Sequence, residues 1–288
     1  METLTERILN IGKRSVKPFN VEDYGIREDE YVKGEMILCR NCHTERLFVD
    51  EAHGIRTRCL CECQSEKLRK SKKEAEELKR QMEIERLQRV SLIGERYKNA
   101  SFTETETGHN ETFDTAYLRC KKYCSVANEV LGKGMGIYLY GTSGTGKTHL
   151  TACMANELIK QRKQVLFTNF FEISKLLKST FNTKETEATH IYRLATIDFL
   201  FIDDLGAERV ANKDGDMWLQ EKVFDVLNKR YNNRKPTIFT SNYSIAELLN
   251  SRGFSQRTID RIAEMSSAVI KLEGKSYRLA NRVKDLPF

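Results

Sequence analysis

A glycine-rich segment, GTSGTGKT at residues 141–148, matches the pattern G-x-x-x-x-G-K-[ST] at every position. Glycines let the backbone curl so that its N–H groups point at phosphate oxygens, and the N-terminus of a following helix adds partial positive charge. Lys147 offers a cation to the β- and γ-phosphates, and Thr148 offers a hydroxyl to Mg²⁺. The pattern therefore predicts a binding site for ATP. The residues expected around the nucleotide are Gly141, Thr142, Ser143, Gly144, Thr145, Gly146, Lys147, Thr148 and His149.

Two adjacent carboxylates, Asp203 and Asp204, follow the apolar run FLFI at residues 199–202. Such a run is typical of a buried strand, and open α/β sheets bind their ligands at the carboxyl ends of the strands. We expect Asp203 to hold Mg²⁺, directly or through water, and Asp204 to orient or deprotonate the attacking water. The simpler alternative is that the pair ends a strand or caps a helix.

A polar amide, Asn242, follows another strand-like run at residues 237–240. At the end of a strand it can touch the γ-phosphate or position the attacking water. A Ser-Asn pair after a strand is more often a turn, so this signal has weight only beside the other two motifs.

Five of the eight cysteines lie between residues 39 and 63, as a CxxC pair followed by a CxCxC group. A tetrahedral Zn²⁺ takes four soft or borderline ligands from two such turns. We expect a structural site that cross-links a segment with a small core, and the alternative is a group of free or buried thiols. Cys63 can replace a member of the second group, and His43 or His53 can supply a nitrogen ligand. The expected zinc ligands are Cys39, Cys42, Cys59 and Cys61.

The segments that carry these motifs differ in composition. Residues 64–98 are highly charged, lack proline and carry sparse apolar residues at steps of three and four, which is typical of a helix with a narrow apolar stripe. From about residue 99, strand-like runs alternate with helical patterns, which predicts an α/β fold with a parallel sheet sandwiched by helices. The expected domains are a zinc-binding segment at 1–65, a charged helical linker at 66–98 and an α/β domain at 99–288.

Composition sets further limits on function. The 288 residues include 48 Lys and Arg against 41 Asp and Glu, a formal net charge of +7. This mild basic excess permits a nucleic-acid partner without requiring one. No apolar run approaches the ~18 residues of a membrane helix, and the charged start lacks the apolar core of a signal peptide. We therefore expect a cytoplasmic protein that does not contact a membrane and keeps its cysteines reduced.

Four motifs in this order resemble those of the DnaC/DnaI-type AAA+ helicase loaders, which include phage-encoded members. They are GTSGTGKTH, FLFIDDLGAE, FTSN and a late DRI followed by GKSYR. The resemblance covers residues 99–288 well, and the cysteine-bearing N-terminus resembles that of the DnaI-like and phage members. The transposition helper ATPase IstB is a close relative of these loaders. The resemblance implies an AAA+ P-loop ATPase fold and ATP hydrolysis.

The resemblance also implies roles for individual side chains. Most AAA+ proteins have Glu where Asp204 stands, which leaves open whether the shorter arm slows hydrolysis or Glu208 assists. An arginine finger reaches the ATP of a neighbouring subunit, whereas sensor II acts within its own subunit. The implied assignments are Lys147 and Thr148 in Walker A, Asp203 and Asp204 in Walker B, Asn242 as sensor I, Arg261 as the arginine finger and Arg278 as sensor II.

By this resemblance, the chain loads a hexameric DnaB-type replicative helicase onto single-stranded DNA at replication initiation. The cysteine-bearing segment and the linker would grip the helicase, and the ATPase domains would associate into a ring or spiral. Basic residues of the assembled channel would contact the DNA, and the sequence does not choose among Lys175, Lys178, Lys184 and Arg193.

Two other functions compete with helicase loading. An IstB-type ATPase would regulate a transposase on DNA, but its N-terminus usually lacks a cysteine knuckle. A scaffold would bind nucleotide only as a structural ligand, and the intact Lys147, Asp203 and Asn242 argue against it.

Overall fold

A computed structural model describes residues 25–50, 55–178, 187–206, 213–250 and 254–277. By their internal contacts, the residues divide into two compact units, Met1–Arg80 and Gln81–Phe288. The division falls within one long helix, and the expected domain limits at residues 65 and 98 stay predictions. No helix in the described ranges is long and apolar enough to cross a membrane.

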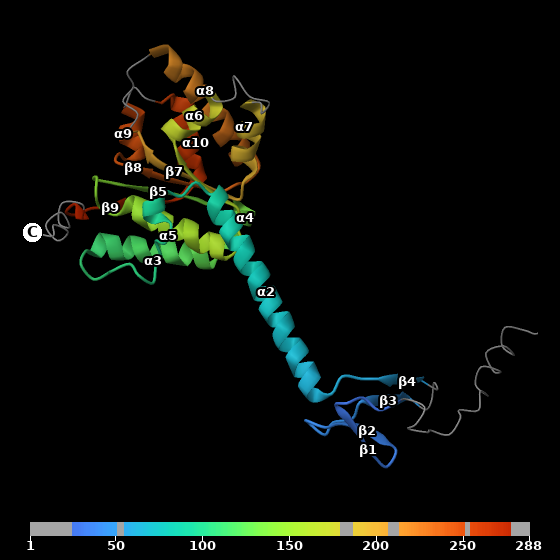
Figure 1. Cartoon of the computed structure of the whole chain (residues 1–288). Coiled ribbons are helices and arrows are strands. Elements are labelled where there is room, and N and C mark those ends of the chain that lie inside the picture. Colours follow the sequence, from blue (N-terminus) through green and yellow to red (C-terminus); the bar gives the residue numbers. More distant parts are fainter. Residues whose placement is uncertain (1–24, 51–54, 179–186, 207–212, 251–253, 278–288) are drawn as a thin grey trace, which may run out of the picture. The chain divides into compact units, whose positions relative to one another are not determined.

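The first unit contains two small antiparallel sheets (Figure 1). Strand β1 (Glu30–Lys33) pairs with β2 (Met36–Cys39), and β3 (Leu47–Asp50) pairs with β4 (Ile55–Arg58). Among the described residues of this unit, few apolar side chains are buried, and Ile37 and Leu47 are two of them.

An ion network fills part of the interior of this first unit. The carboxylate of Glu30 is fully buried and accepts two hydrogen bonds of 2.8 Å from Arg58 Nη1. Arg46, which is also buried, lies 3.4 Å from the same carboxylate. Buried ion pairs contribute little net stability, and the described part of so small a unit buries few apolar side chains to compensate.

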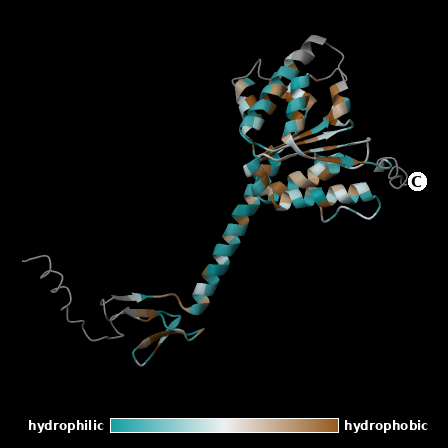
Figure 2. Cartoon of the chain, turned by 180° about the vertical axis from the view of Figure 1, so that it is seen from behind, coloured by the Kyte–Doolittle hydropathy of each residue, from teal (hydrophilic) through white to brown (hydrophobic). Residues whose placement is uncertain are grey.

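Helix α2 (Glu62–Val90) is highly charged and mostly exposed, and Figure 2 shows it as hydrophilic along its length. Its apolar residues Leu68, Leu78 and Met82 are exposed, whereas Leu87 is buried in the core of the second unit. The sequence predicts a helix that continues to about residue 98, whereas α2 ends at Val90. Beyond that end, the Ser91 carbonyl accepts a 2.7 Å hydrogen bond from the backbone N–H of Phe167, which fastens the chain to a strand edge.

The second unit is built on a five-stranded sheet in the order β6-β7-β8-β5-β9, in which all pairings are parallel. This confirms the predicted parallel sheet. The last strand was not predicted, because its exposed and buried residues alternate as expected at a sheet edge and it has no continuous apolar run. The strands are β5 (Gly136–Gly141), β6 (Val165–Asn169), β7 (Phe199–Leu205), β8 (Thr237–Ser241) and β9 (Ser266–Leu272).

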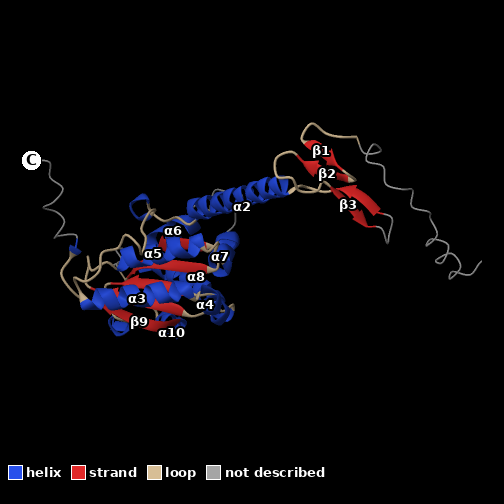
Figure 3. Ribbon diagram, turned by 90° about the horizontal axis from the view of Figure 1, so that it is seen from below, coloured by secondary structure: helices blue, strands red, loops and turns tan. Residues whose placement is uncertain are grey.

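Helices cover both faces of this sheet (Figures 1 and 3). Alternate residues of one strand enter different cores: Ile137 and Leu139 pack with α3 and α5, whereas Tyr138 packs with α6, α7, α8 and α10. This two-layered burial confirms the expected α/β sandwich. Besides a 3₁₀ turn η2 (Glu95–Tyr97), the helices are α3 (Glu111–Ser125), α4 (Ala127–Lys133), α5 (Lys147–Lys160), α6 (Phe170–Lys178), α7 (Glu187–Thr196), α8 (Lys213–Asn232), α9 (Ile245–Asn250) and α10 (Gln256–Met265).

Candidate nucleotide site and cysteine cluster

The glycine-rich loop joins β5 to α5 in a conformation that only glycine tolerates. Gly141 and Gly146 have φ of 146° and 97°. A Cβ on Gly141 would lie 1.9 Å from the carbonyl oxygen of Leu272, and one on Gly146 would lie 2.7 Å from the ring of Phe113. The loop is therefore pressed against β9 and α3, and α5 starts directly after it at Lys147.

The ammonium group of Lys147 lies inside the loop. Its Nζ donates to the carbonyl oxygens of Gly141 and Thr142 at 2.8 and 2.9 Å, and to Asn242 Oδ1 at 2.9 Å. The side chain is largely buried. These neutral oxygens can be exchanged for phosphate oxygens, which carry charge and bind an ammonium more strongly.

Asp203 lies at the end of β7 between two hydroxyl donors. Thr148 Oγ1 lies 3.1 Å from each of its carboxylate oxygens, and Thr240 Oγ1 donates to Oδ1 at 2.6 Å. Burial raises the pKa of the Asp203 carboxyl, because the charged form is taken out of water. A divalent cation beside Thr148 and Asp203 would offset this penalty, and their oxygens are the hard ligands that Mg²⁺ prefers.

Asp204 is exposed and has φ of 57°, in the left-handed region that few non-glycine residues adopt. Its N–H donates to Thr240 Oγ1 at 2.8 Å, and its Oδ1 accepts from Asn242 Nδ2 at 3.1 Å. Asn242 thus contacts both Lys147 and Asp204. Thr240 was assigned no role from the sequence, and the signal available was its place on the strand next to the carboxylates.

A cavity of about 1290 Å³ opens over these groups. Ligand pockets commonly measure about 300–1,000 Å³. The cavity exceeds this range, so it is large enough for a nucleoside triphosphate. Of the residues expected at the nucleotide, Gly141, Thr142 and Thr145 do not line the cavity. Those that do line it are Ser143, Gly144, Gly146, Lys147, Thr148, His149, Asp203, Asp204 and Asn242.

The segment before α3 forms a cavity wall that the sequence did not predict. Arg96, Tyr97 and Ala100 line the cavity. The buried Asn156 of α5 holds this segment, since its Nδ2 donates to the carbonyls of Tyr97 and Ala100 at 2.9 and 2.8 Å. Residues of this kind follow no short motif, because their role depends on packing between distant segments.

His149 lies on the same wall of the cavity. Its Nε2 is 2.9 Å from Thr105 Oγ1, which itself donates to the carbonyl of Ser101 at 2.7 Å. The Thr105 oxygen therefore accepts from Nε2–H. Burial lowers the pKa of His149, so the imidazole is neutral at pH 7.

The two expected arginines fall outside this cavity or outside the described residues. Arg261 does not line the cavity and lies on α10, where its guanidinium carbon is 3.9 Å from the ring centroid of Tyr231. Arg278, like Glu208, is beyond the described residues. Among the described lining residues, the Lys and Arg side chains are Lys147 and Arg96.

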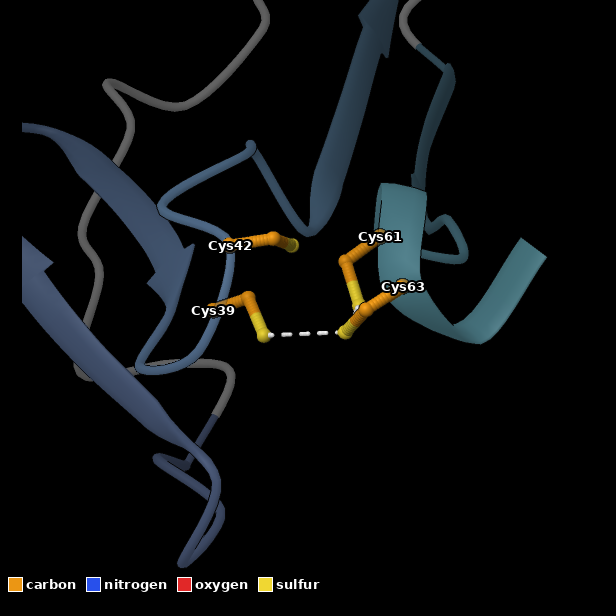
Figure 4. Close-up of side chains that lie close together, drawn as sticks. All are labelled: Cys39, Cys42, Cys61 and Cys63. Atoms are coloured by element: carbon orange, nitrogen blue, oxygen red, sulfur yellow. Dashed lines mark hydrogen bonds between the residues drawn. The ribbon is translucent and has the colours of Figure 1, made fainter. Parts of the chain in front are cut away.

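Four thiols of the first unit gather into one group (Figure 4). The Sγ atoms of Cys39, Cys42, Cys61 and Cys63 all lie within 4.8 Å of one another. Cys63 Sγ is 3.7 Å from Cys39 Sγ and 3.2 Å from Cys61 Sγ. Four sulfur ligands in such a group fit a tetrahedral structural Zn²⁺.

This group corrects the expected ligand set, in which Cys59 stood in place of Cys63. The backbone N–H of Cys59 donates to the Arg46 carbonyl at 2.9 Å, and its thiol donates to the Glu45 carbonyl at 3.4 Å. Cys61 and Cys63 instead flank the first residue of α2, where the chain turns toward the CxxC pair. His43 lies beside Tyr31, and His53 is outside the described residues.

Neighbouring side chains act differently on the thiols of the cluster: hydrogen bonds lower the pKa of Cys42, at Cys61 burial is outweighed by hydrogen bonds that lower the pKa, and the contact with Cys61 raises the pKa of Cys63 to about 12. The Thr44 hydroxyl, 3.0 Å from Cys42 Sγ, lowers the pKa of the Cys42 thiol to about 5. Arg46 Nη1 donates to Cys61 Sγ at 3.3 Å. Because the thiolate is the form that ligates metal, these contacts suit a metal site.

Comparisons with known proteins agree with this geometry. The family model described as "IstB-like ATP binding protein" matches residues 73–285. The phage-like element PBSX protein XkdC of Bacillus subtilis (strain 168) is 27% identical over 250 residues, which cover 85% of this chain and 86% of that protein. The replicative helicase loader DnaI of the same organism is 32% identical over 158 residues, which cover 51% of this chain and 49% of the loader.

A solved structure shares the fold. The crystal structure of DnaI aligns with a TM-score of 0.53 and 25% identity, over 66% of this chain and 98% of that chain. The parallel sheet, the glycine-rich loop and the carboxylates at the strand ends are those of an AAA+ ATPase fold. With the family model matching most of its length, this chain belongs to the IstB-like ATP-binding protein family and is similar to the DnaC/DnaI helicase loaders.

Proposed function

We propose that this protein hydrolyses ATP to load a hexameric DnaB-type replicative helicase onto single-stranded DNA during replication initiation. The observation that carries the proposal is the hydrogen-bonded chain from Lys147 through Asn242 to Asp204, beside a cavity of about 1290 Å³ that is large enough for a nucleotide. It occurs in a family with relatives named as replicative helicase loaders.

In this proposal the loop and the strand ends divide the chemistry. The loop N–H groups and Lys147 bind the β- and γ-phosphates. Thr148 and Asp203 would hold Mg²⁺, which would supply positive charge beside the phosphates. Asp204 orients or deprotonates the attacking water. Asn242 contacts the γ-phosphate and keeps the Asp204 carboxylate in place through its amide.

Arg261 acts on the ATP of a neighbouring subunit in this mechanism. The supporting observation is that Arg261 does not line the cavity of its own subunit. Turnover then requires self-association into a ring or spiral, with Arg278 as sensor II within its own subunit. Loss of the γ-phosphate would release Asn242 and Arg261 and change the packing between subunits.

The cysteine cluster serves the proposed partner. Zn²⁺ held by Cys39, Cys42, Cys61 and Cys63 would cross-link the first unit, which has few buried apolar side chains over the ranges that the structure describes. That unit, with the charged helix that follows it, would grip the helicase.

Helicase loading is tested with the full chain and a purified hexameric helicase. Wild-type protein with ATP should co-elute with the helicase and transfer it to circular single-stranded DNA. Lys147→Ala and Asp204→Asn should lose at least about 100-fold in ATP turnover, because each removes a group acting on the transition state. The exposed Lys229→Ala serves as the control. Unchanged turnover in both site variants would contradict the enzyme proposal, and a failure to bind any DnaB-type helicase would contradict the loader proposal.

The second candidate function is regulation of a transposase on DNA, which the description of the matching family model favours. It predicts ATP-dependent filaments on duplex DNA, visible by electron microscopy, and no transfer of helicase. The clustered thiols at the start of the chain weigh against it, because IstB-type proteins usually lack such a knuckle.

A further inference from the structure

Helices α8 and α10 meet at the side chain of Arg261. Its guanidinium carbon lies 3.9 Å above the ring centroid of Tyr231, close enough for a stacked cation–π contact. Nη1 pairs with Glu264 Oε2 at 2.5 Å, and Nη2 donates to Asn228 Oδ1 at 3.1 Å. Nε is buried and has no hydrogen-bond partner among the described residues.

Asn228 and Tyr231, the two α8 residues that contact Arg261, lie beside a buried side chain that holds the end of the helix in place. Tyr231 follows Arg230, whose side chain is fully buried and donates to the carbonyls of Leu194, Ile197 and Pro236. The end of α8 is therefore tied to the residues just before β7 and β8, which holds the backbone next to Tyr231 in place, although Tyr231 itself is 42% exposed. Asn228 precedes Tyr231 by three residues and so lies on the same face of the helix.

We propose that Tyr231, with Asn228, is a positioning residue that presents the Arg261 guanidinium in one orientation to the nucleotide of a neighbouring subunit. This inference rests on the proposed function, since it takes Arg261 as the group supplied across the subunit boundary. A flexible arginine loses rotamer freedom whenever it is ordered, whereas a stacked one has already lost it. Such preorganisation matters most where charge develops in a transition state.

The contacts differ in how easily phosphate oxygens can replace them. Glu264 is 53% exposed, so a neighbour's phosphates can take its place at Nη1. The centroid of the Tyr231 ring lies 3.9 Å from the guanidinium carbon, and the ring takes up no hydrogen bond of Nη1 or Nη2, which pair with Glu264 and Asn228. The stack can therefore persist while the ion pair is exchanged.

The first test compares steady-state turnover of three full-length variants at a concentration where the wild type is assembled. Arg261→Ala should lose at least about 100-fold in kcat. Tyr231→Leu should lose roughly 10- to 100-fold in kcat with KM for ATP unchanged, because the guanidinium is misplaced while the nucleotide site is intact. Tyr231→Phe keeps the ring and should restore most of the turnover.

The second test separates positioning from general damage to the fold. Tyr231→Leu chains are mixed with an excess of Asp204→Asn chains. The Asp204→Asn chains have an inactive site of their own but keep the contacts of Tyr231 and Asn228 with Arg261. Turnover should recover, because Tyr231→Leu sites then receive a correctly held arginine from their neighbours. Damage confined to the Tyr231→Leu chain would not be rescued in this way.

The outcomes are distinguishable. If Arg261→Ala turns over like the wild type, the arginine of the proposed function is wrong and this inference falls with it. If Arg261→Ala is inactive while Tyr231→Leu is fully active, or if mixing gives no recovery, the positioning role alone is overturned and the proposed function stands.

Discussion

At the scale of single residues, Asn242 is where the two halves of the candidate site meet. Its side-chain Oδ1 accepts a hydrogen bond from Lys147 Nζ, and its side-chain Nδ2 donates one to Asp204 Oδ1. A phosphate group that attracted Lys147 would break the first bond and leave the second. Asn242 is therefore placed to couple occupancy of the loop to the position of the carboxylate proposed to act on water.

Thr240 gives the first prediction at this scale. Its hydroxyl donates to Asp203 and accepts from the N–H of Asp204, so Thr240→Val leaves both groups without this partner. An unsatisfied buried group costs about 1–3 kcal/mol, and 1.4 kcal/mol corresponds to about tenfold in rate. We expect ATP turnover to fall about tenfold in Thr240→Val and to be kept in Thr240→Ser. Equal turnover in the two variants would show that the hydroxyl has no role.

The pKa of Asp203 gives a second prediction. Because burial raises it above the ordinary 3.8, the folded protein binds this proton more tightly than the unfolded chain does. Ionisation of Asp203 therefore costs stability, and the cost is complete once the pH exceeds the raised pKa. Without nucleotide and Mg²⁺, Asp203→Asn should have a higher Tm than the wild type at pH 7, and the difference should shrink as the pH falls through that pKa.

The same variant should fail to hydrolyse ATP with Mg²⁺, because the amide is a poor replacement for a charged metal ligand. Adding Mg²⁺ and ATP should then raise the Tm of the wild type more than that of Asp203→Asn. A lower Tm for the metal-free variant at pH 7 would contradict the burial argument.

Residue types and spacing predicted Lys147, Asp203, Asp204 and Asn242 because each belongs to a short motif at a strand end. Thr240 could not be assigned a role, since a threonine in a strand is ordinary until its neighbour across the sheet is known. The choice between Cys59 and Cys63 depended on where the segment after β4 ends and α2 begins, and the spacing of the cysteines does not reveal that position.

At the scale of elements, the end of α8 is fastened by one buried arginine. Arg230 is fully buried, yet its guanidinium reaches carbonyl groups from α7, from the turn before β7 and from the start of β8. Burial lowers the pKa of Arg230 to about 9, which still leaves it charged at pH 7. One side chain thus satisfies backbone groups of several segments at once.

Replacing this arginine tests its role as a fastener. Arg230→Met fills much of the same volume but leaves buried carbonyls unsatisfied, so the free energy of unfolding should fall by about 3 kcal/mol. Lys229→Met, at the exposed neighbouring position, should change it by no more than about 0.5 kcal/mol. Urea denaturation followed by circular dichroism measures both, and equal midpoints would contradict the interpretation.

The elements themselves were largely predictable from the sequence. Continuous apolar runs identified the buried strands, while the half-exposed edge strand β9 was missed because it has no such run. The end of α2 at Val90 was also missed; just beyond it, the Ser91 carbonyl accepts a hydrogen bond from the backbone N–H of Phe167 in a distant strand, a contact that the local sequence does not reveal.

At the scale of the whole molecule, the two units are stabilised differently. The second has two extended apolar cores, one on each face of its sheet. In its described part, the first has short strands, few buried apolar residues and a buried ion network around Glu30. Its four clustered thiols are the groups best able to supply the missing stabilisation through a metal.

Metal content tests this difference between the units. Elemental analysis should find one zinc ion bound per wild-type chain and per Cys59→Ser chain, and none in Cys63→Ser. The reason is that Cys63 belongs to the thiol cluster and Cys59 does not. A chelator should lower the unfolding temperature of the first unit and leave that of the second unchanged. Zinc retained in Cys63→Ser and lost in Cys59→Ser would restore the ligand set first expected.

The class of fold and the chemistry of the phosphate loop follow from the amino-acid sequence, because short motifs and apolar periodicity act through neighbouring residues. The folded chain is needed to learn which thiols gather, which threonine contacts the paired carboxylates, which segment lines the cavity and which side chains contact Arg261. Those choices depend on contacts between residues far apart in the chain, and such contacts leave no pattern of spacing to read.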